Sequence, residues 1–302
     1  MYLFYVLCYN IIIITVYGGI NMKEIKQQKS VIREFTSVNE FESYITNSPL
    51  NEVFRWETLS SVKGTQSFTQ TKSYEEATSL FKNGWDSMAK NITHQLNVKK
   101  NQTLDTHVQK VMFDVVGFQA SVPRYLQGIP TNMVNKKLVP IKQKVITLNK
   151  DISYNAYTST QDIIDASIQT LQLIKKIEAQ GIRVNLNLIF GVKAGGNTEV
   201  VKIRLKSANE RLNISKLAFP LVHPSMLRRL LFRYIEVAPT VTKGFRGGYG
   251  YPLDGSQLKA YCKDEYVLPR LFDGDITQIN DLATICSITD NIKNGKQDKP
   301  KF

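Results

Sequence analysis

The amino-acid sequence predicts an α/β fold in which helices flank a central sheet. Three observations carry this prediction: an apolar strand at residues 145–149, a long amphipathic helix at 160–180, and two alternating strands at 182–190 and 201–205. A strand, a covering helix and a returning strand are the unit from which layered α/β sheets are built. We therefore expect these segments to form the centre of the fold.

The helix at 160–180 has clear start and stop signals. Ser159 can cap its first turn, and Gly181 follows its last apolar turn, where a left-handed residue commonly ends a helix. Its apolar side chains recur at helical spacing on one face, namely Ile164, Ile168, Leu171 and Ile174. This face is expected to pack on the sheet.

The two following strands alternate apolar with polar residues, which is typical of half-buried strands. The connector GVKAGGNTE is rich in turn residues, so we expect the strands to be antiparallel neighbours. A helix should then begin at Pro224, with Arg228, Arg229 and Arg233 off its apolar stripe.

The N-terminal region predicts a mixture of elements. Residues 23–48 have apolar spacing that favours short helices, and 52–71 read as a loop with a short strand. Ser73 and Glu76 form a capping-box pattern before a helical stripe that runs to Ile92. A strand is expected at 108–116.

Residues 117–136, GFQASVPRYLQGIPTNMVNK, contain two prolines and two glycines that interrupt regular structure. The apolar residues among them predict a long loop that packs against the body. Long ordered loops often carry function, so Arg124, Tyr125 and Asn132 are candidate contacts for a partner.

The sequence suggests four parts. Residues 1–21 carry no charge, and Gly18-Gly19 can be encoded as a ribosome-binding sequence just before Met22, so this segment is interpreted as a non-native or mis-annotated leader, with a membrane anchor as the alternative. The expected division of the chain is then an N-terminal α+β region at 22–140, an α/β core at 141–290 and a disordered tail at 291–302. No membrane association is expected if the leader is not native.

The chain is basic, with a net charge of +13 and a pI of about 9.5. A positive balance favours polyanions, so nucleic acid is a possible partner. The glycine-rich stretch GFRGGYGYP adds an arginine among aromatic residues, a pattern that suits stacking on single-stranded nucleic acid, with a packed glycine loop as the alternative. The candidate cations are Lys202, Arg204, Lys206, Arg228, Arg229, Arg233 and Arg246.

The sequence offers no catalytic motif. Its three cysteines form no CxxC pair, and HExxH, GxSxG and a complete phosphate-binding Walker loop are absent. His223 has no nearby serine or cysteine and is interpreted as a capping or core residue. We therefore expect a protein that is not an enzyme.

Oxygen-bearing side chains follow the strand at 145–149. Asp151, Ser153 and Asn155 alternate there, at the sheet edge where open α/β folds bind ligands. Such oxygens suit Mg²⁺, whereas the alternative is a turn that caps itself.

This DISYN segment, with the strand, helix, strand and antiparallel strand order, resembles the opening of a von Willebrand factor A domain over residues 141–240. The metal loop of that family reads Asp-x-Ser-x-Ser, whereas Asn155 takes the last position here. The resemblance implies a three-layer, Rossmann-like sheet flanked by helices, with an N-terminal α+β extension. Such domains typically serve as adaptors, and some are similar to partners of MoxR-type AAA+ ATPases.

A second resemblance rests on SYEEATSLFKNGWDSMAK, FDVVGFQASVPRYLQGIPTNMV and FPLVHPSMLRRLLFRYIE. Over residues 73–252 the chain is similar to a family of uncharacterised bacteriophage and prophage proteins. The resemblance implies a phage protein in the host cytoplasm, with a virion component as an alternative. The combined expectation is a non-enzymatic adaptor that binds a protein partner, and the alternative is a protein that binds RNA or single-stranded DNA.

Overall fold

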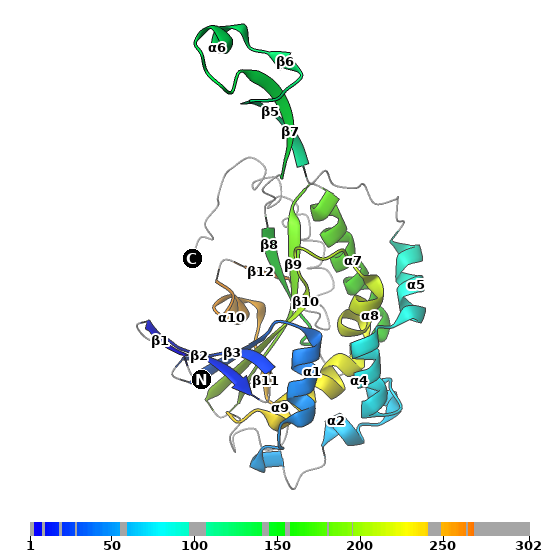
Figure 1. The fold of residues 1–302 in the computed structure, drawn as a ribbon. Coiled ribbons are helices and arrows are strands. Elements are labelled where there is room, and N and C mark those ends of the chain that lie inside the picture. The colour runs from blue at the N-terminus through cyan, green and yellow to red at the C-terminus, as the bar shows by residue number, and fades with distance from the viewer. Residues whose placement is uncertain are drawn as a thin grey trace.

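In the computed structural model, the chain forms a body around one large mixed sheet and an arm that projects from the body (Figure 1). The structure describes residues 3–7, 10–17, 20–27, 29–54, 59–96, 107–140, 145–154, 158–179, 181–194, 196–240, 249–263 and 265–268.

The body sheet has the order β1-β2-β3-β4-β10-β9-β8-β12 in the described part of the chain, with β11 added beside β9. Its strands are β1 (Leu3–Leu7), β2 (Asn10–Tyr17), β3 (Ile20–Gln27), β4 (Ser30–Phe35), β8 (Val145–Asp151), β9 (Arg183–Ala194), β10 (Asn197–Lys206), β11 (Tyr251–Pro252) and β12 (Tyr266–Leu268). Strand β8 is parallel to both of its neighbours, β9 and β12, while β10 is antiparallel to β9. The predicted antiparallel pairing of β9 with β10 is therefore confirmed.

The expectation of short helices between residues 23 and 35 is wrong. Strand β3 pairs antiparallel with β4, and β4 pairs in parallel with β10. Strand β4 has packed layers on both of its faces: Phe35 lies in the cluster with Phe41 and Tyr234, and Ile32 lies in the cluster with Leu253 and Leu258. Burial on both faces removes the alternation by which a strand is recognised. The N-terminal strands β1 to β4 thus belong to the same sheet as the core segment.

One face of the sheet is covered by helices (Figure 1). The predicted helix forms as α7 (Thr160–Ala179), and its face with Ile168, Leu171 and Ile174 packs on Leu148 and Leu186 of the sheet. The other helices of this layer are α1 (Val38–Asn47), α4 (Tyr74–Asn83), α5 (Asp86–Gln95), α8 (Ile214–Val222), the π-helical turn η2 (Met226–Leu231) and α9 (Phe232–Val237).

The opposite face carries the short helix α10 (Gly255–Lys259). Leu253 and Leu258 lie over Gly191 of β9, where an added Cβ would come within 2.7 Å of the Leu253 side chain. The glycine therefore lets this layer approach the sheet closely. Among the described residues, the fold is a mixed sheet with helices on both faces, and the two layers are unequal.

The helical stripe predicted from Ser73 to Ile92 forms two helices rather than one. The Ser73 hydroxyl accepts the N–H of Glu76 at the start of α4, as predicted. The helix ends at Gly84, whose φ of 94° is available only to glycine without strain, and α5 begins after Trp85. The remaining short helices, η1 (Glu52–Phe54), α2 (Ser60–Lys63) and α3 (Gln66–Thr69), occupy the segment expected to be a loop with a short strand.

Under the helical layer lies a buried ion network centred on Arg33 of β4. Its Nε donates to Glu24 Oε2 at 2.9 Å, and its guanidinium also bonds Glu199 and, at 3.3 Å, the Tyr234 hydroxyl. Burial opposes the charge, yet Tyr234 and the two carboxylates raise the pKa of Arg33 above its usual value. The network joins β3, β4, β10 and α9 and keeps their buried charges neutralised.

Candidate interaction site

The arm is a three-stranded antiparallel sheet that stands away from the body (Figure 1). It consists of β5 (His107–Asp114), β6 (Gln119–Ala120), α6 (Val122–Leu126) and β7 (Met133–Pro140). Strand β7 lies in the middle and pairs with β5 along its whole length and with β6 at its start. The helix α6 and the turn after it form the far end, which we call the tip.

The arm exposes its apolar residues instead of burying them. No side chain from Lys110 to Lys137 is buried. Tyr125 is 68% exposed and Leu126 is 78% exposed, so the expectation that this loop packs against the body is wrong. The large exposed apolar side chains of the arm are Val111, Met112, Phe113, Val115, Val116, Phe118, Val122, Tyr125 and Leu126.

Polar contacts hold the tip in shape. The guanidinium of Arg124 donates to the carbonyl and hydroxyl oxygens of Thr131 at 2.9 and 3.0 Å, and it lies 4.3 Å from the centre of the Phe113 ring. The Asn132 side chain donates to the Ile129 carbonyl at 3.1 Å. Of the three predicted contact residues, Arg124 and Asn132 therefore shape the tip, while Tyr125 is presented to solvent.

Phe118 is held over the same sheet by a close backbone approach. Its N–H donates to Val134 of β7 at 2.9 Å, and a Cβ on Gly117 would lie 2.1 Å from the Val134 carbonyl oxygen, so only glycine fits there. The Lys136 ammonium lies 5.3 Å from the Phe118 ring centre, in cation–π range. The arm thus displays aromatic rings with cations beside them.

The arm is also basic. Residues 107–140 contain the cations Lys110, Arg124, Lys136 and Lys137, and the single carboxylate Asp114. A hydrogen bond from Lys137, at 2.5 Å, lowers the pKa of Asp114. The sequence contains one sign of this exposure. The run VMFDVVGF has apolar residues on both faces of the expected strand, and no long amphipathic helix follows it directly to cover either face.

The predicted nucleic-acid cations on β10 are engaged inside the protein. Lys202 is buried and donates to Glu265 at 2.9 Å, with Glu34 at 3.5 Å, and the buried Lys206 donates to Glu178 at 2.6 Å. Arg204 is half-buried and donates to the Asn187 side chain at 2.8 Å. These contacts occupy the charges that phosphates would need.

The cations after Pro224 are engaged in the same way. Arg229 is fully buried and donates to carbonyl oxygens of the α2–α3 segment, including Ser61 at 2.9 Å and Gly64 at 3.1 Å. Arg228 donates to the Phe68 carbonyl at 2.6 Å, and Arg233 donates to the Ile45 carbonyl at 3.2 Å. Arg228 and Arg229 hold the α2–α3 segment to η2, and Arg233 holds α1 to α9. Arg246 lies outside the described residues.

The predicted metal loop is described only in part. Asp151 and Ser153 lie at the carboxyl end of β8, both 1% exposed, whereas Asn155 falls outside the described residues. Asp151 Oδ1 accepts the N–H of Ser153 at 2.8 Å, which is the self-capping turn, while the buried Ser153 hydroxyl has no hydrogen-bond partner within the described residues. No group of three or more His, Cys, Asp or Glu side chains suits a metal in the described ranges. A Mg²⁺ site here stays a prediction, which titration of Mg²⁺ into the full chain would test.

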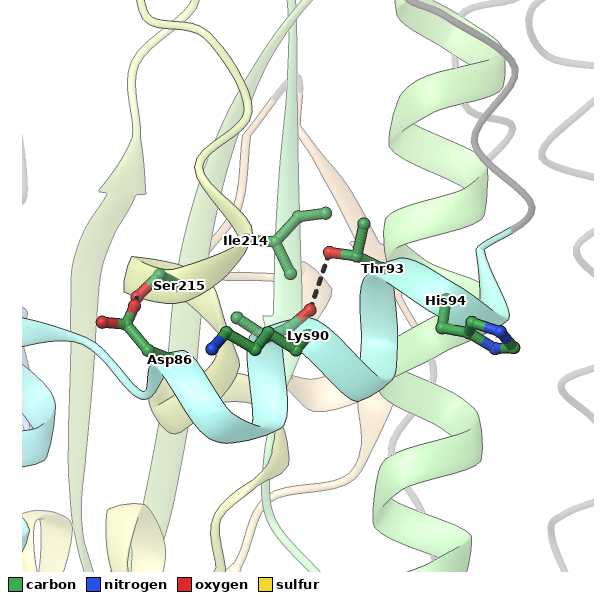
Figure 2. Close-up of a pocket in the computed structure, with 7 residues that line it drawn as sticks. Asp86, Lys90, Thr93, His94, Ile214 and Ser215 are labelled. Atoms are coloured by element: carbon green, nitrogen blue, oxygen red, sulfur yellow. Dashed lines mark hydrogen bonds between the residues drawn. The ribbon is translucent and has the colours of Figure 1, made fainter.

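A surface hollow of about 650 Å³ lies between α5 and the start of α8 (Figure 2). The Ser215 hydroxyl donates to Asp86 there, and the Thr93 hydroxyl donates to the Ala89 carbonyl at 2.7 Å. His94 sits at the other end of the helix from Asp86 and Ser215, and its side chain points away from them (Figure 2). The three side chains therefore do not form a relay for general base catalysis.

Neither a search of curated proteins nor a search of solved structures found a significant match. In the described part of the chain, no helix is both long and apolar enough to cross a bilayer. One family model, described as a domain of unknown function (DUF7192), matches residues 15–293 and so includes both the body and the arm. The chain belongs to the DUF7192 family.

Proposed function

We propose that this protein is a phage-encoded, non-enzymatic adaptor that binds a protein partner through the tip of its arm. The observation that carries the proposal is the apolar surface of the arm, where Val122, Tyr125 and Leu126 are each more than half exposed. Contiguous exposed apolar surface on a folded protein marks an interaction site.

The chemistry of the tip favours a protein partner. Tyrosine and arginine are enriched at the energetic centres of protein interfaces, and Arg124 lies directly beside Tyr125. Because Arg124 already binds Thr131, the tip is ordered before it meets a partner, and less conformational entropy is lost on binding. The four cations of the arm favour a partner with an acidic rim.

The architecture of the body supports an adaptor of the A-domain type. In sequence order β8, β9, β10 and β12 become strands 1, 2, 3 and 4 of a 3-2-1-4 arrangement, with strand 3 antiparallel. The resemblance to a von Willebrand factor A domain rests on the order strand, helix, strand and antiparallel strand, which β8, α7, β9 and β10 follow, and α7 provides the crossover between the first two strands. On this reading we propose an AAA+ ATPase of the MoxR type as the partner, an argument from fold-level analogy.

The competing proposal is nucleic-acid binding. It loses support because Lys202, Lys206 and Arg229 are buried against protein oxygens. A mobility-shift series in rising salt would restore it if affinity for RNA or single-stranded DNA fell steeply as salt increased.

Site-specific photocrosslinking tests the proposal. A photoreactive phenylalanine analogue replaces Tyr125 in the full chain during infection, and the matched control replaces Val62, which is 49% exposed on α2. We expect one abundant protein adduct at position 125 and none at 62. The change Leu126→Ser in the same chain should abolish that adduct, since it removes an exposed apolar anchor. Adducts only with nucleic acid or lipid, or none at all, would overturn the proposal.

A further inference from the structure

The outer edge of β5 is an open pairing edge. The strand bonds to β7 on one side, and no described residue pairs with its other side. Exposed edges invite another strand, and proteins usually protect them with prolines, bulges or charged side chains. Strand β5 has no proline and no register shift, and its charged side chains are Lys110 and Asp114, with Val111, Met112 and Phe113 exposed between them.

The two charges of β5 are matched unequally by its own neighbour β7: Asp114 has an ion pair there, whereas Lys110 does not. In the register of the arm, Lys110 lies directly opposite Lys137, a like-charge pair that destabilises a ladder. Asp114 lies opposite Met133, and Lys137 must reach diagonally to meet it at 2.5 Å. The strand therefore carries a cation and an anion four residues apart, with an apolar run between them.

We propose that two copies of this chain pair through their β5 edges, antiparallel about a twofold axis at Met112. In this register Lys110 of each copy lies opposite Asp114 of the other, and Val111 lies opposite Phe113. Two three-stranded arms then become one six-stranded sheet. The surface is the edge of the arm rather than its tip, so the inference goes beyond the proposed function.

Charge complementarity selects this register and this partner. A twofold axis one residue away, at Val111 or Phe113, would place Lys110 or Asp114 opposite apolar or uncharged residues. Parallel pairing of two copies in register would place Lys110 against Lys110. Only the axis at Met112 forms two ion pairs, and the strand is then its own complement, which an unrelated strand has no reason to be.

Packing also favours association of the arms. Small sheets need a buried apolar face or additional strands for stability, and the arm buries none of its side chains between Lys110 and Lys137. Joining two arms doubles the strand number and covers Met112, which is 37% exposed, with its counterpart.

A charge-swap experiment tests the proposal by sedimentation of the full chain over a range of concentrations. We expect the wild-type chain to dimerise reversibly. Lys110→Asp alone and Asp114→Lys alone should each raise the dimer dissociation constant about tenfold or more, because each creates two like-charge pairs across the dyad. An equimolar mixture of the two variants should recover wild-type affinity, since both pairs are then of opposite charge. A monomeric wild type, unaffected single variants, or a mixture that stays dissociated would overturn the proposal.

Further variants separate pairing from local damage. Lys137→Ala removes the bridge to Asp114 and the like charge opposite Lys110, both within the arm, and should leave the dimer intact. Met112→Cys should crosslink two chains through a short reagent, whereas Val62→Cys on α2 should not. Tyr125→Ser should leave dimerisation unchanged, because Tyr125 lies at the tip and not on the β5 edge. The dimer hypothesis and the hypothesis of a partner site at the tip can therefore fail independently.

Discussion

The body and the arm place charged and apolar side chains in opposite environments. In the body, charged side chains such as Arg33, Glu199 and Arg229 are buried and bonded. In the arm, apolar side chains such as Phe118 and Leu126 face solvent, and a cation lies over the Phe118 ring.

This difference in burial indicates that the body determines the stability of the protein, whereas the arm is available for binding. Burial in the body makes its interior intolerant of change, because each buried charge depends on its partners. The arm has no interior of its own, so its apolar residues contribute little to folding of the body and remain available for binding. Substitutions should therefore have large effects on the stability of the body and small effects when made in the arm.

The largest effect is expected from Arg33→Met. This change leaves Glu24 and Glu199 without their buried cation, and breaking such a network costs about 3–5 kcal/mol. The matched control is Lys23→Met, which loses only the exposed bridge to Glu34 and should cost less than about 1 kcal/mol. Urea unfolding of the three proteins measures both, and equal costs would contradict the assignment of Arg33 as the centre of the network.

The next largest effect is expected from His223, whose titration should make the free energy of unfolding depend on pH. Burial lowers the pKa of His223 to about 4, with Trp85 and Phe219 rings against it and Glu76 opposing the shift weakly. The folded state therefore favours the neutral ring, and stability that is complete above pH 6.5 is lost as pH falls from 6.5 to 4, by roughly 3 kcal/mol. Unfolding free energies across this range should show that slope in the wild type, and His223→Gln should flatten it. A slope unchanged by the substitution would assign it to other groups.

The smallest effect is expected from Leu126→Ala at the tip. An exposed side chain with no interior to support should change the free energy of unfolding by less than about 0.5 kcal/mol. The same substitution at Leu171, which is fully buried between α7 and the sheet, should cost about 2–5 kcal/mol. Thermal and urea unfolding compare the two, and a Leu126→Ala cost near that of Leu171→Ala would show that the arm packs against the body.

Local patterns in the sequence were sufficient for the centre of the fold. The α7 stripe, its Gly181 end and the β9–β10 turn depend on neighbouring residues, and all three were predicted. The prediction of short helices at β3 and β4 was wrong because β4 pairs with β10, far along the chain, and local spacing carries no sign of that pairing. The sequence also could not predict whether the candidate cations face solvent or bond within the protein. Lys206, for example, bonds Glu178 only because α7 packs on the sheet in the observed position.

The parallel pairing of β4 with β10 has a consequence for how the polypeptide matures. The register pairs Ser30 with Thr198 and Phe35 with Ile203. Strand β4 therefore lacks its partner β10 until the ribosome has synthesised about two thirds of the chain. Contacts between such distant segments slow folding, and an unpaired strand is prone to aggregate before its partner strand has been synthesised. Nascent chains of this protein should therefore need protection early in synthesis, and truncation before residue 206 should yield insoluble product.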